Sequence, residues 1–251
     1  METPVPSPHP ADEPSHPQKL RCRLVLIVPG DWILQNGSNA ARRLEAAFAA
    51  ADVASVIVFQ GTVTEPEFQK ILPPVVASAQ NAGVAVMVDG EPRIAARTGA
   101  DGVHLGQDPD ALRKAIDQYA PKMMVGAGNV RTRHNALVIG ELQPDYVMFG
   151  KPGADTHEEA HPKNLALGQW WSAMVEIPCI VLGGKNIETV VDVAKTGADF
   201  VALSSAIFVP DADGKGTYAT QSGGDNAIAD RVRHANTLLD DHAPELEILD
   251  D

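Results

Sequence analysis

The chain has 251 residues, of which 44% are apolar and only 5% aromatic, so it can bury a sizeable aliphatic core in one large domain or two small ones. Its 33 acidic and 20 basic residues give a net charge of −13, which argues against nucleic acid or an anionic membrane as the main partner. Cys22 and Cys179 are too few for a disulfide framework or a zinc cluster, and they indicate a reducing, cytoplasmic compartment.

Both ends of the chain have the composition of tails. Residues 1–19 contain six prolines and no apolar segment, which predicts a disordered tail and neither a signal peptide nor a membrane anchor. Residues 241–251 are rich in acidic side chains and predict a second, solvated tail. We therefore expect a single domain over residues 20–240.

Eight short apolar segments recur along this domain. Each is too short for a helix, rich in Val and Ile, and apolar on both alternating faces, as expected for a parallel strand that is covered on both sides. The predicted strands are 23–28, 54–59, 84–88, 101–105, 122–127, 145–149, 178–182 and 199–203.

Segments with helical spacing separate the strands. The clearest are 39–51, 109–120 and 186–197. Strand and helix alternate eight times, which favours a (β/α)8 TIM barrel over an open doubly wound sheet.

An eight-residue sequence occurs twice with small changes: 98–105 reads TGADGVHL and 196–203 reads TGADFVAL. Both copies cover a helix end, a turn and a strand, in units four and eight. Duplication of a half barrel would explain the repeat. A Gly-Ala-Asp turn that suits any helix-to-strand connection explains it equally well.

The segments after strands seven and eight are the usual phosphate-binding loops of a TIM barrel. Here Gly183, Gly184 and Lys185 follow strand seven, and Ser204 and Ser205 follow strand eight. Glycines let backbone N–H groups approach an anion closely, while the serine hydroxyls and the lysine add donors and positive charge. The pattern predicts a phosphate site, although two glycines after a strand can also form a simple tight turn.

Other polar residues follow the remaining strands. Lys151, after strand six, could move protons, form a Schiff base or contact an anion, and it could equally be an ordinary solvated lysine. Asp89 and Asp108 could hold Mg²⁺ or transfer protons. His104, on strand four, is either a catalytic group or a buried core imidazole.

Residues 157–161 read His-Glu-Glu-Ala-His and match a zinc-protease pattern. That chemistry needs both histidines on one face of a helix with an apolar side. The surrounding sequence is polar, and Pro162 prevents a helix from continuing through it. We expect a mobile loop over the barrel mouth. Adventitious metal binding by the two histidines is a better explanation of the pattern than protease activity.

Four segments together resemble the thiamine phosphate synthase family, which also contains the aminothiazole tautomerases. They are residues 98–108, 144–151, 181–199 and 201–208. The resemblance spans residues 22–208 and implies a TIM barrel of thiamin biosynthesis that binds a phosphorylated thiazole or pyrimidine and forms a homodimer or larger assembly. The synthases join a pyrimidine pyrophosphate to thiazole phosphate with Mg²⁺, whereas the tautomerases aromatise thiazole phosphate without a metal.

The phosphate-binding residues of the family match the chain at Gly183, Gly184 and the Ser204-Ser205 pair. The pyrophosphate-binding residues do not. Where the synthases have Gln-x-Arg-x-Lys after strand two, residues 60–64 keep the glutamine as Gln60 but have threonine at both cationic positions.

Further family positions differ as well. The Asn-Asp pair after strand three is Asp89-Gly90, and the later aspartate is Pro109, with Asp108 and Asp110 on either side as candidate substitutes. The serine after strand five is Gly128, the Thr-x-Thr-Lys motif is absent from 151–164, and the tautomerase histidine is Lys151.

Pyrophosphate departure needs cations and metal to neutralise the developing charge, so these differences predict little synthase activity. Three hypotheses remain: a thiamin-pathway enzyme of this family, a non-catalytic barrel that binds or senses a phosphorylated ligand, and an unrelated barrel enzyme that acts on another phosphorylated metabolite.

Overall fold

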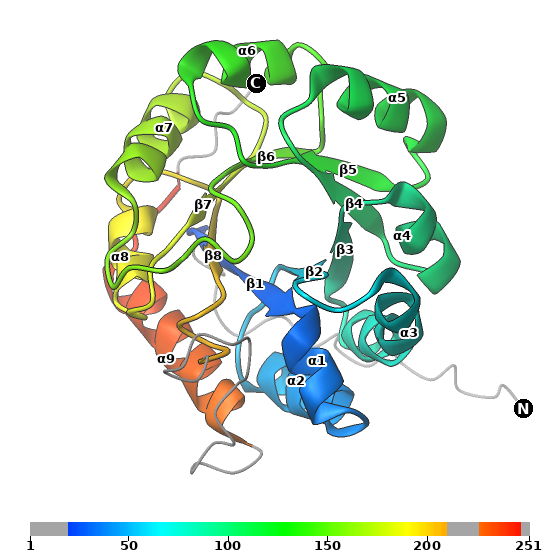
Figure 1. Cartoon of the computed structure of the whole chain (residues 1–251). Coiled ribbons are helices and arrows are strands. Elements are labelled where there is room, and N and C mark those ends of the chain that lie inside the picture. Colours follow the sequence, from blue (N-terminus) through cyan, green and yellow to red (C-terminus); the bar gives the residue numbers. More distant parts are fainter. Residues whose placement is uncertain (1–19, 210–225, 247–251) are drawn as a thin grey trace, which may run out of the picture.

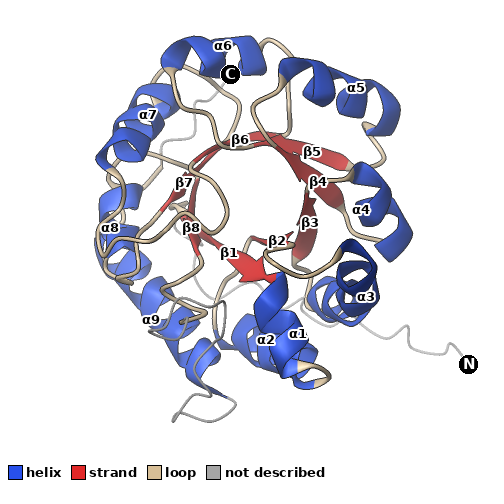
Figure 2. Ribbon diagram, viewed as in Figure 1, coloured by secondary structure: helices blue, strands red, loops and turns tan. Residues whose placement is uncertain are grey.

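Eight parallel strands form a closed barrel surrounded by helices (Figures 1 and 2). The structure is a computed structural model that describes residues 20–209 and 226–246. The strands are β1 Arg23–Pro29, β2 Ser55–Phe59, β3 Ala85–Asp89, β4 Gly102–Leu105, β5 Met124–Ala127, β6 Tyr146–Phe149, β7 Cys179–Leu182 and β8 Phe200–Leu203. Strand β1 pairs with both β2 and β8, which closes the ring. The predicted (β/α)8 TIM barrel is confirmed, and each predicted strand agrees with an observed one to within two residues at either end.

The helices lie outside the barrel, as the strand-helix alternation predicts. They are α1 Gly30–Asn36, α2 Asn39–Ala50, α3 Glu65–Asn81, α4 Pro92–Thr98, α5 Pro109–Tyr119, α6 Arg133–Gly140, α7 Pro162–Ser172, α8 Thr189–Ala194 and α9 Ala227–His242. Pro162 begins α7, because a proline at the first helical position lacks only an amide that would have no partner there. Residues 157–161 are not helical, so the two histidines of the zinc-protease pattern do not share a helix face.

The core has two layers that follow from the two faces of each strand. Val25 and Ile27 of β1 point into the barrel, where they belong to a cluster with Ile57, Met87 and Leu182. Leu24, Leu26 and Val28, which alternate with them on β1, belong to a second and larger cluster on the outer side of the barrel. Both faces of the strands are therefore covered, as the continuous apolar segments predicted.

The repeated Gly-Ala-Asp turn has a local explanation. The Asp101 carboxylate accepts a hydrogen bond from the Val86 amide at 2.7 Å, and the Asp199 carboxylate accepts one from the Cys179 amide at 2.8 Å. In both cases the aspartate accepts a hydrogen bond from an amide at the start of the preceding strand. Asp145 does the same without belonging to a repeat. The aspartate of such a turn therefore has a structural role that recurs in the barrel, as an acceptor for an amide of the preceding strand.

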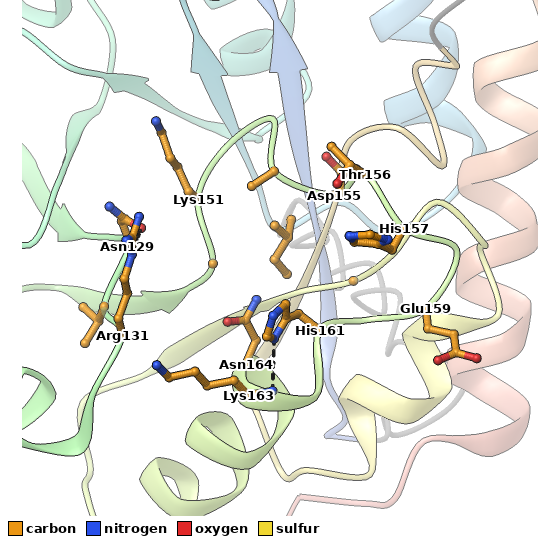
Figure 3. Close-up of a pocket in the computed structure, with 15 residues that line it drawn as sticks. Asn129, Arg131, Lys151, Asp155, Thr156, His157, Glu159, His161, Lys163 and Asn164 are labelled. Carbon is orange, nitrogen blue, oxygen red and sulfur yellow. Dashed lines mark hydrogen bonds between the residues drawn. The ribbon is translucent and has the colours of Figure 1, made fainter. Parts of the chain in front are cut away.

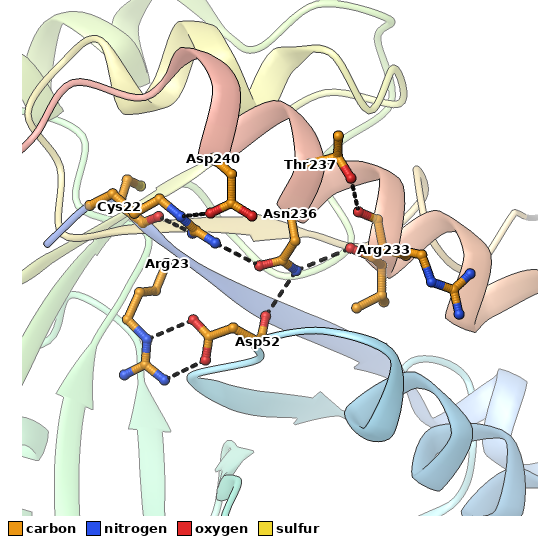
Figure 4. Close-up of polar contacts among 9 residues, drawn as sticks. Cys22, Arg23, Asp52, Arg233, Asn236, Thr237 and Asp240 are labelled. Atoms are coloured by element: carbon orange, nitrogen blue, oxygen red, sulfur yellow. Dashed lines mark hydrogen bonds and ion pairs between the residues drawn. The ribbon is translucent and has the colours of Figure 1, made fainter. Parts of the chain in front are cut away.

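Polar contacts join the last helix to the first two strands where the barrel closes (Figure 4). The buried Asn236 side chain of α9 accepts from Arg21 at 3.0 Å and donates to the Asp52 carbonyl at 2.9 Å. Arg23 donates two hydrogen bonds to the Asp52 carboxylate, at 2.9 and 2.7 Å, and thereby lowers the pKa of that carboxyl. These contacts connect α9, β1 and the segment that leads into β2.

The expected tails fall largely outside the described residues, which begin at Leu20 and end at Leu246. Helix α9 continues to His242, two residues past the expected domain end, and the Leu246 amide donates to the Leu20 carbonyl at 2.7 Å. Within the ranges that the structure describes, no helix combines the length and the apolar character needed to cross a membrane.

Candidate functional site

A cavity of about 310 Å³ opens at the carboxyl ends of β5, β6 and β7, next to the start of α7 (Figure 3). Its titratable lining residues are the bases Arg131, Lys151, His157, His161 and Lys163 and the acids Asp155 and Glu159. This excess of basic groups contrasts with the net charge of −13 for the whole chain. In the view of Figure 3, Arg131 and Lys163 lie on one side of the cavity and Asp155 and Glu159 on the other.

The two predicted phosphate-binding segments lie side by side at this mouth. The Gly183 amide donates to the Ala202 carbonyl at 2.9 Å, which joins the end of β7 to the end of β8. Gly183 lines the cavity, and the adjoining Ser204 is only 2% exposed. The barrel therefore brings together the residues that the sequence placed 20 positions apart.

The segment 151–161 lies directly over these strand ends. The Lys185 amide donates to the His157 carbonyl at 2.8 Å, and the Asn186 amide donates to the Glu158 carbonyl at 3.1 Å. A Cβ atom at Gly184 would lie 2.3 Å from the Glu158 carbonyl oxygen, so only glycine allows this approach. The predicted loop over the mouth is present, and here it is held by backbone hydrogen bonds.

Asp155 anchors the same segment to strand β8. Its side chain is 4% exposed, and its Oδ2 accepts a hydrogen bond from the Ser205 amide. Burial raises the pKa of Asp155, and the groups of Ser204 and Ser205 around the carboxylate oppose that rise. Within the described residues, Oδ1 of Asp155 has no hydrogen-bond partner. Sequence reasoning missed Asp155, because a single acid in a polar loop gives no signal of a partner 50 residues away.

Lys151 and Asp89 follow or end different strands of the barrel, β6 and β3, at the same mouth. Lys151 is exposed and lines the cavity, and Asp89 is the last residue of β3. Burial raises the pKa of Asp89 to about 6, although the nearby charge of Lys151 acts in the opposite direction. A carboxyl group with a pKa near neutrality is suited to taking up and releasing a proton.

His104 lies in the barrel interior and makes a specific contact there. It is 1% exposed, and its Nδ1 lies 2.8 Å from the Tyr146 hydroxyl. Burial lowers the pKa of His104 to about 4. A Cβ atom at Gly128 would lie 2.1 Å from Nε2 of His104, so the glycine after β5 provides room for this ring. Neither His104 nor Gly128 lines the cavity.

In the segment after β2, the polar groups of Thr62 are bound by a carboxylate of the chain itself. Asp31, at the start of α1, accepts from the Thr62 amide at 3.0 Å and from the Thr62 hydroxyl. The Gln60 side-chain amide donates to the Val63 carbonyl at 2.6 Å and so braces the same loop. The structure therefore places Gln60 in a turn and leaves no free backbone amide at Thr62.

The predicted metal ligands do not converge. Asp108 is exposed and caps α5, where its Oδ1 accepts from the Asp110 amide at 3.0 Å. In the parts of the chain that the structure describes, no group of three or more His, Cys, Asp or Glu side chains is arranged to hold a metal ion.

The comparisons with known proteins agree with this architecture. The family model of thiamine monophosphate synthase matches residues 24–207. A thiamine-phosphate synthase of Hyphomonas neptunium is 33% identical over 193 residues, covering 75% of this chain and 86% of the relative, and that of Rhodospirillum centenum is 34% identical over 190 residues, covering 74% and 89%.

A solved structure supports the fold in the same way. The thiamine phosphate pyrophosphorylase from Pyrococcus furiosus superimposes with a TM-score of 0.66 at 17% identity, over 90% of this chain and 98% of that one. On the family match and the two relatives together, the chain belongs to the thiamine monophosphate synthase family.

Proposed function

We propose that this protein binds a phosphorylated thiazole at the ends of β7 and β8 and acts on the thiazole moiety in thiamin biosynthesis. The observation that carries the proposal is the position of the Gly183-Gly184 and Ser204-Ser205 segments, which adjoin through the 2.9 Å hydrogen bond from Gly183 to Ala202. The Ser205 amide already holds a carboxylate, which supports its capacity to bind an anionic oxygen.

The reactive groups proposed for this site are Lys151 and Asp89. A tautomerisation removes one proton from the thiazole and returns one at another atom, so it needs a base and an acid at the same mouth. Asp89, with a pKa of about 6, can fill either role near neutral pH, and Lys151 lies close enough to influence it. His104 contributes a buried hydrogen bond to Tyr146 and no group in the cavity.

The residues present do not fit the magnesium and pyrophosphate chemistry of a synthase. The amide and hydroxyl of Thr62 bind Asp31, the Asp108 carboxylate caps a helix, and Gly90 supplies no carboxylate. Because pyrophosphate departure relies on cations and metal, we expect negligible coupling to a pyrimidine pyrophosphate.

A non-catalytic barrel that binds or senses the same ligand is the second candidate. It is favoured by the segment 151–161, whose His157 and Glu158 carbonyls already occupy the Lys185 and Asn186 amides after β7. Such a protein would bind thiazole phosphate and leave it unchanged.

Calorimetric titration tests the binding proposal directly. Thiazole phosphate should bind measurably, and the unphosphorylated thiazole should not. Equal binding of both would overturn the phosphate site. Proton NMR of the bound ligand then separates the two candidates, because tautomerisation changes the thiazole spectrum and passive binding does not. Lys151→Gln should abolish that change while it leaves the fold intact, since the side chain is exposed.

A further inference from the structure

The β6–α7 connection brings a carboxylate of the chain itself to the place proposed for phosphate. We propose that Asp155 lowers the affinity of this site for phosphate, because its segment competes with phosphate for the backbone amides at the ends of β7 and β8. The inference rests on the proposed phosphate site and adds that a ligand binds there only when Asp155 leaves.

The contacts of this segment match those that an anion would make. Within four consecutive residues, the Asp155 carboxylate binds the Ser205 amide, the His157 carbonyl binds the Lys185 amide and the Glu158 carbonyl binds the Asn186 amide. All three amides follow β7 or β8. A phosphate needs free N–H donors, so the segment and the ligand cannot use these amides together.

The closed arrangement leaves one of its own groups unsatisfied. Asp155 lines the cavity and is 4% exposed, and its Oδ1 has no hydrogen-bond partner among the described residues. A buried carboxylate oxygen without a partner weakens the state that contains it. The covering segment is therefore held strongly enough to occupy the site and weakly enough to be displaced.

The groups around the cavity favour the exchange. Arg131, Lys151 and Lys163 line the same space, and none of them forms an ion pair within 4 Å in the described part of the chain. These three cations can interact with an entering phosphate, and they can also interact with the Asp155 carboxylate once the phosphate has displaced it. The cavity adjoins Gly183, so these cations lie next to the β7 end.

The effect of Asp155 on affinity follows from the fraction of molecules in which the segment is open. Apparent affinity falls in proportion to that fraction. Asp155→Asn keeps the shape of the side chain and an acceptor for the Ser205 amide. A charge-assisted hydrogen bond is about twice as strong as a neutral one, so the variant holds the segment 151–161 less tightly over the strand ends. We expect inorganic phosphate to bind Asp155→Asn about tenfold more tightly than the unmodified protein.

Glu159→Gln is the matched control for this titration. Glu159 lines the same cavity and carries the same charge, but it is exposed and makes no hydrogen bond to the strand ends. Its replacement should change the affinity for inorganic phosphate by no more than about twofold, as for an exposed, screened charge. The inference is overturned by unchanged or weaker phosphate binding in Asp155→Asn, by an equal gain in Glu159→Gln, or by no phosphate binding in any of the three proteins.

Hydrogen exchange of the unmodified protein gives a readout that needs no substitution. Saturating inorganic phosphate should speed amide exchange in 154–161 while the amides of Lys185, Asn186 and Ser205 stay protected, because phosphate replaces the segment as their partner. Slower or unchanged exchange in 154–161 contradicts the inference. If both phosphate experiments succeed and thiazole phosphate binds no better than inorganic phosphate, only the proposed thiazole ligand fails.

Discussion

One buried and one partly buried titratable group, at one place in the barrel, should make its stability depend on pH in opposite directions. Asp89 and His104 are paired residues of β3 and β4. Burial lowers the pKa of His104 from 6.5 to about 4 and raises the pKa of Asp89 from 3.8 to about 6. The prediction concerns the free energy of unfolding between pH 4 and pH 6.5.

The signs follow from which state binds more protons. The unfolded chain protonates His104 first, so the contribution of His104 is present above pH 6.5 and is lost as the pH falls to about 4. Folding keeps Asp89 protonated, so its contribution is present below pH 3.8 and is lost as the pH rises through about 6. At 1.36 kcal/mol for each pKa unit, His104 contributes about 3 kcal/mol, and the partly exposed Asp89 contributes about 2 kcal/mol after solvent screening.

Urea unfolding at several pH values measures both contributions as differences from the unmodified protein. From pH 4 to pH 6.5, Asp89→Asn should gain about 2 kcal/mol of stability relative to the parent, and His104→Asn should lose about 3 kcal/mol relative to it. The parent itself should show a shallow profile, because the two terms oppose each other. Differences that do not vary with pH, or that have the opposite signs, would refute this assignment of the two environments.

Three further substitutions test packing and hydrogen bonds. Gly128→Ser should cost about 2 kcal/mol in urea unfolding because its Cβ would lie 2.1 Å from the His104 ring, whereas Gly106→Ala, with no atom within 4 Å of the added Cβ, should be nearly neutral; equal costs would contradict the contact. Asn236→Ala should cost about 2 kcal/mol because it removes the hydrogen bonds of a buried amide to Arg21 and to the Asp52 carbonyl, and a loss below about 0.5 kcal/mol would remove its role in closing the barrel. Gly184→Ala should push the segment 151–161 off the β7 end and speed exchange of the two following amides; unchanged exchange would mean that the segment adapts.

The fold could be predicted because each strand carries its own signal. The strands are buried on both faces, so they read as short Val- and Ile-rich segments, and the intervening helices show their usual spacing. The ends of helices follow less directly from the pattern: residues 186–197 predicted a long helix, whereas α8 covers only Thr189–Ala194, and the Asn186 amide before it binds the Glu158 carbonyl of the segment above the mouth.

The site could be predicted only where a loop follows a strand directly. Gly183, Gly184, Ser204 and Ser205 adjoin because strands β7 and β8 are neighbours, and that follows from the barrel alone. The partner of the Ser205 amide could not be predicted, since the contact with Asp155 depends on how the polar loop after β6 folds over the barrel. The burial of His104 depends in the same way on a glycine in the next strand loop, a contact that no motif describes.

A crystal structure with thiazole phosphate bound tests the central claim most directly. The account predicts the phosphate on the Ser205 amide and the amides after β7, with Asp155 displaced from its present position. A phosphate held among Arg131, Lys151 and Lys163 with Asp155 still bound to Ser205 would contradict it.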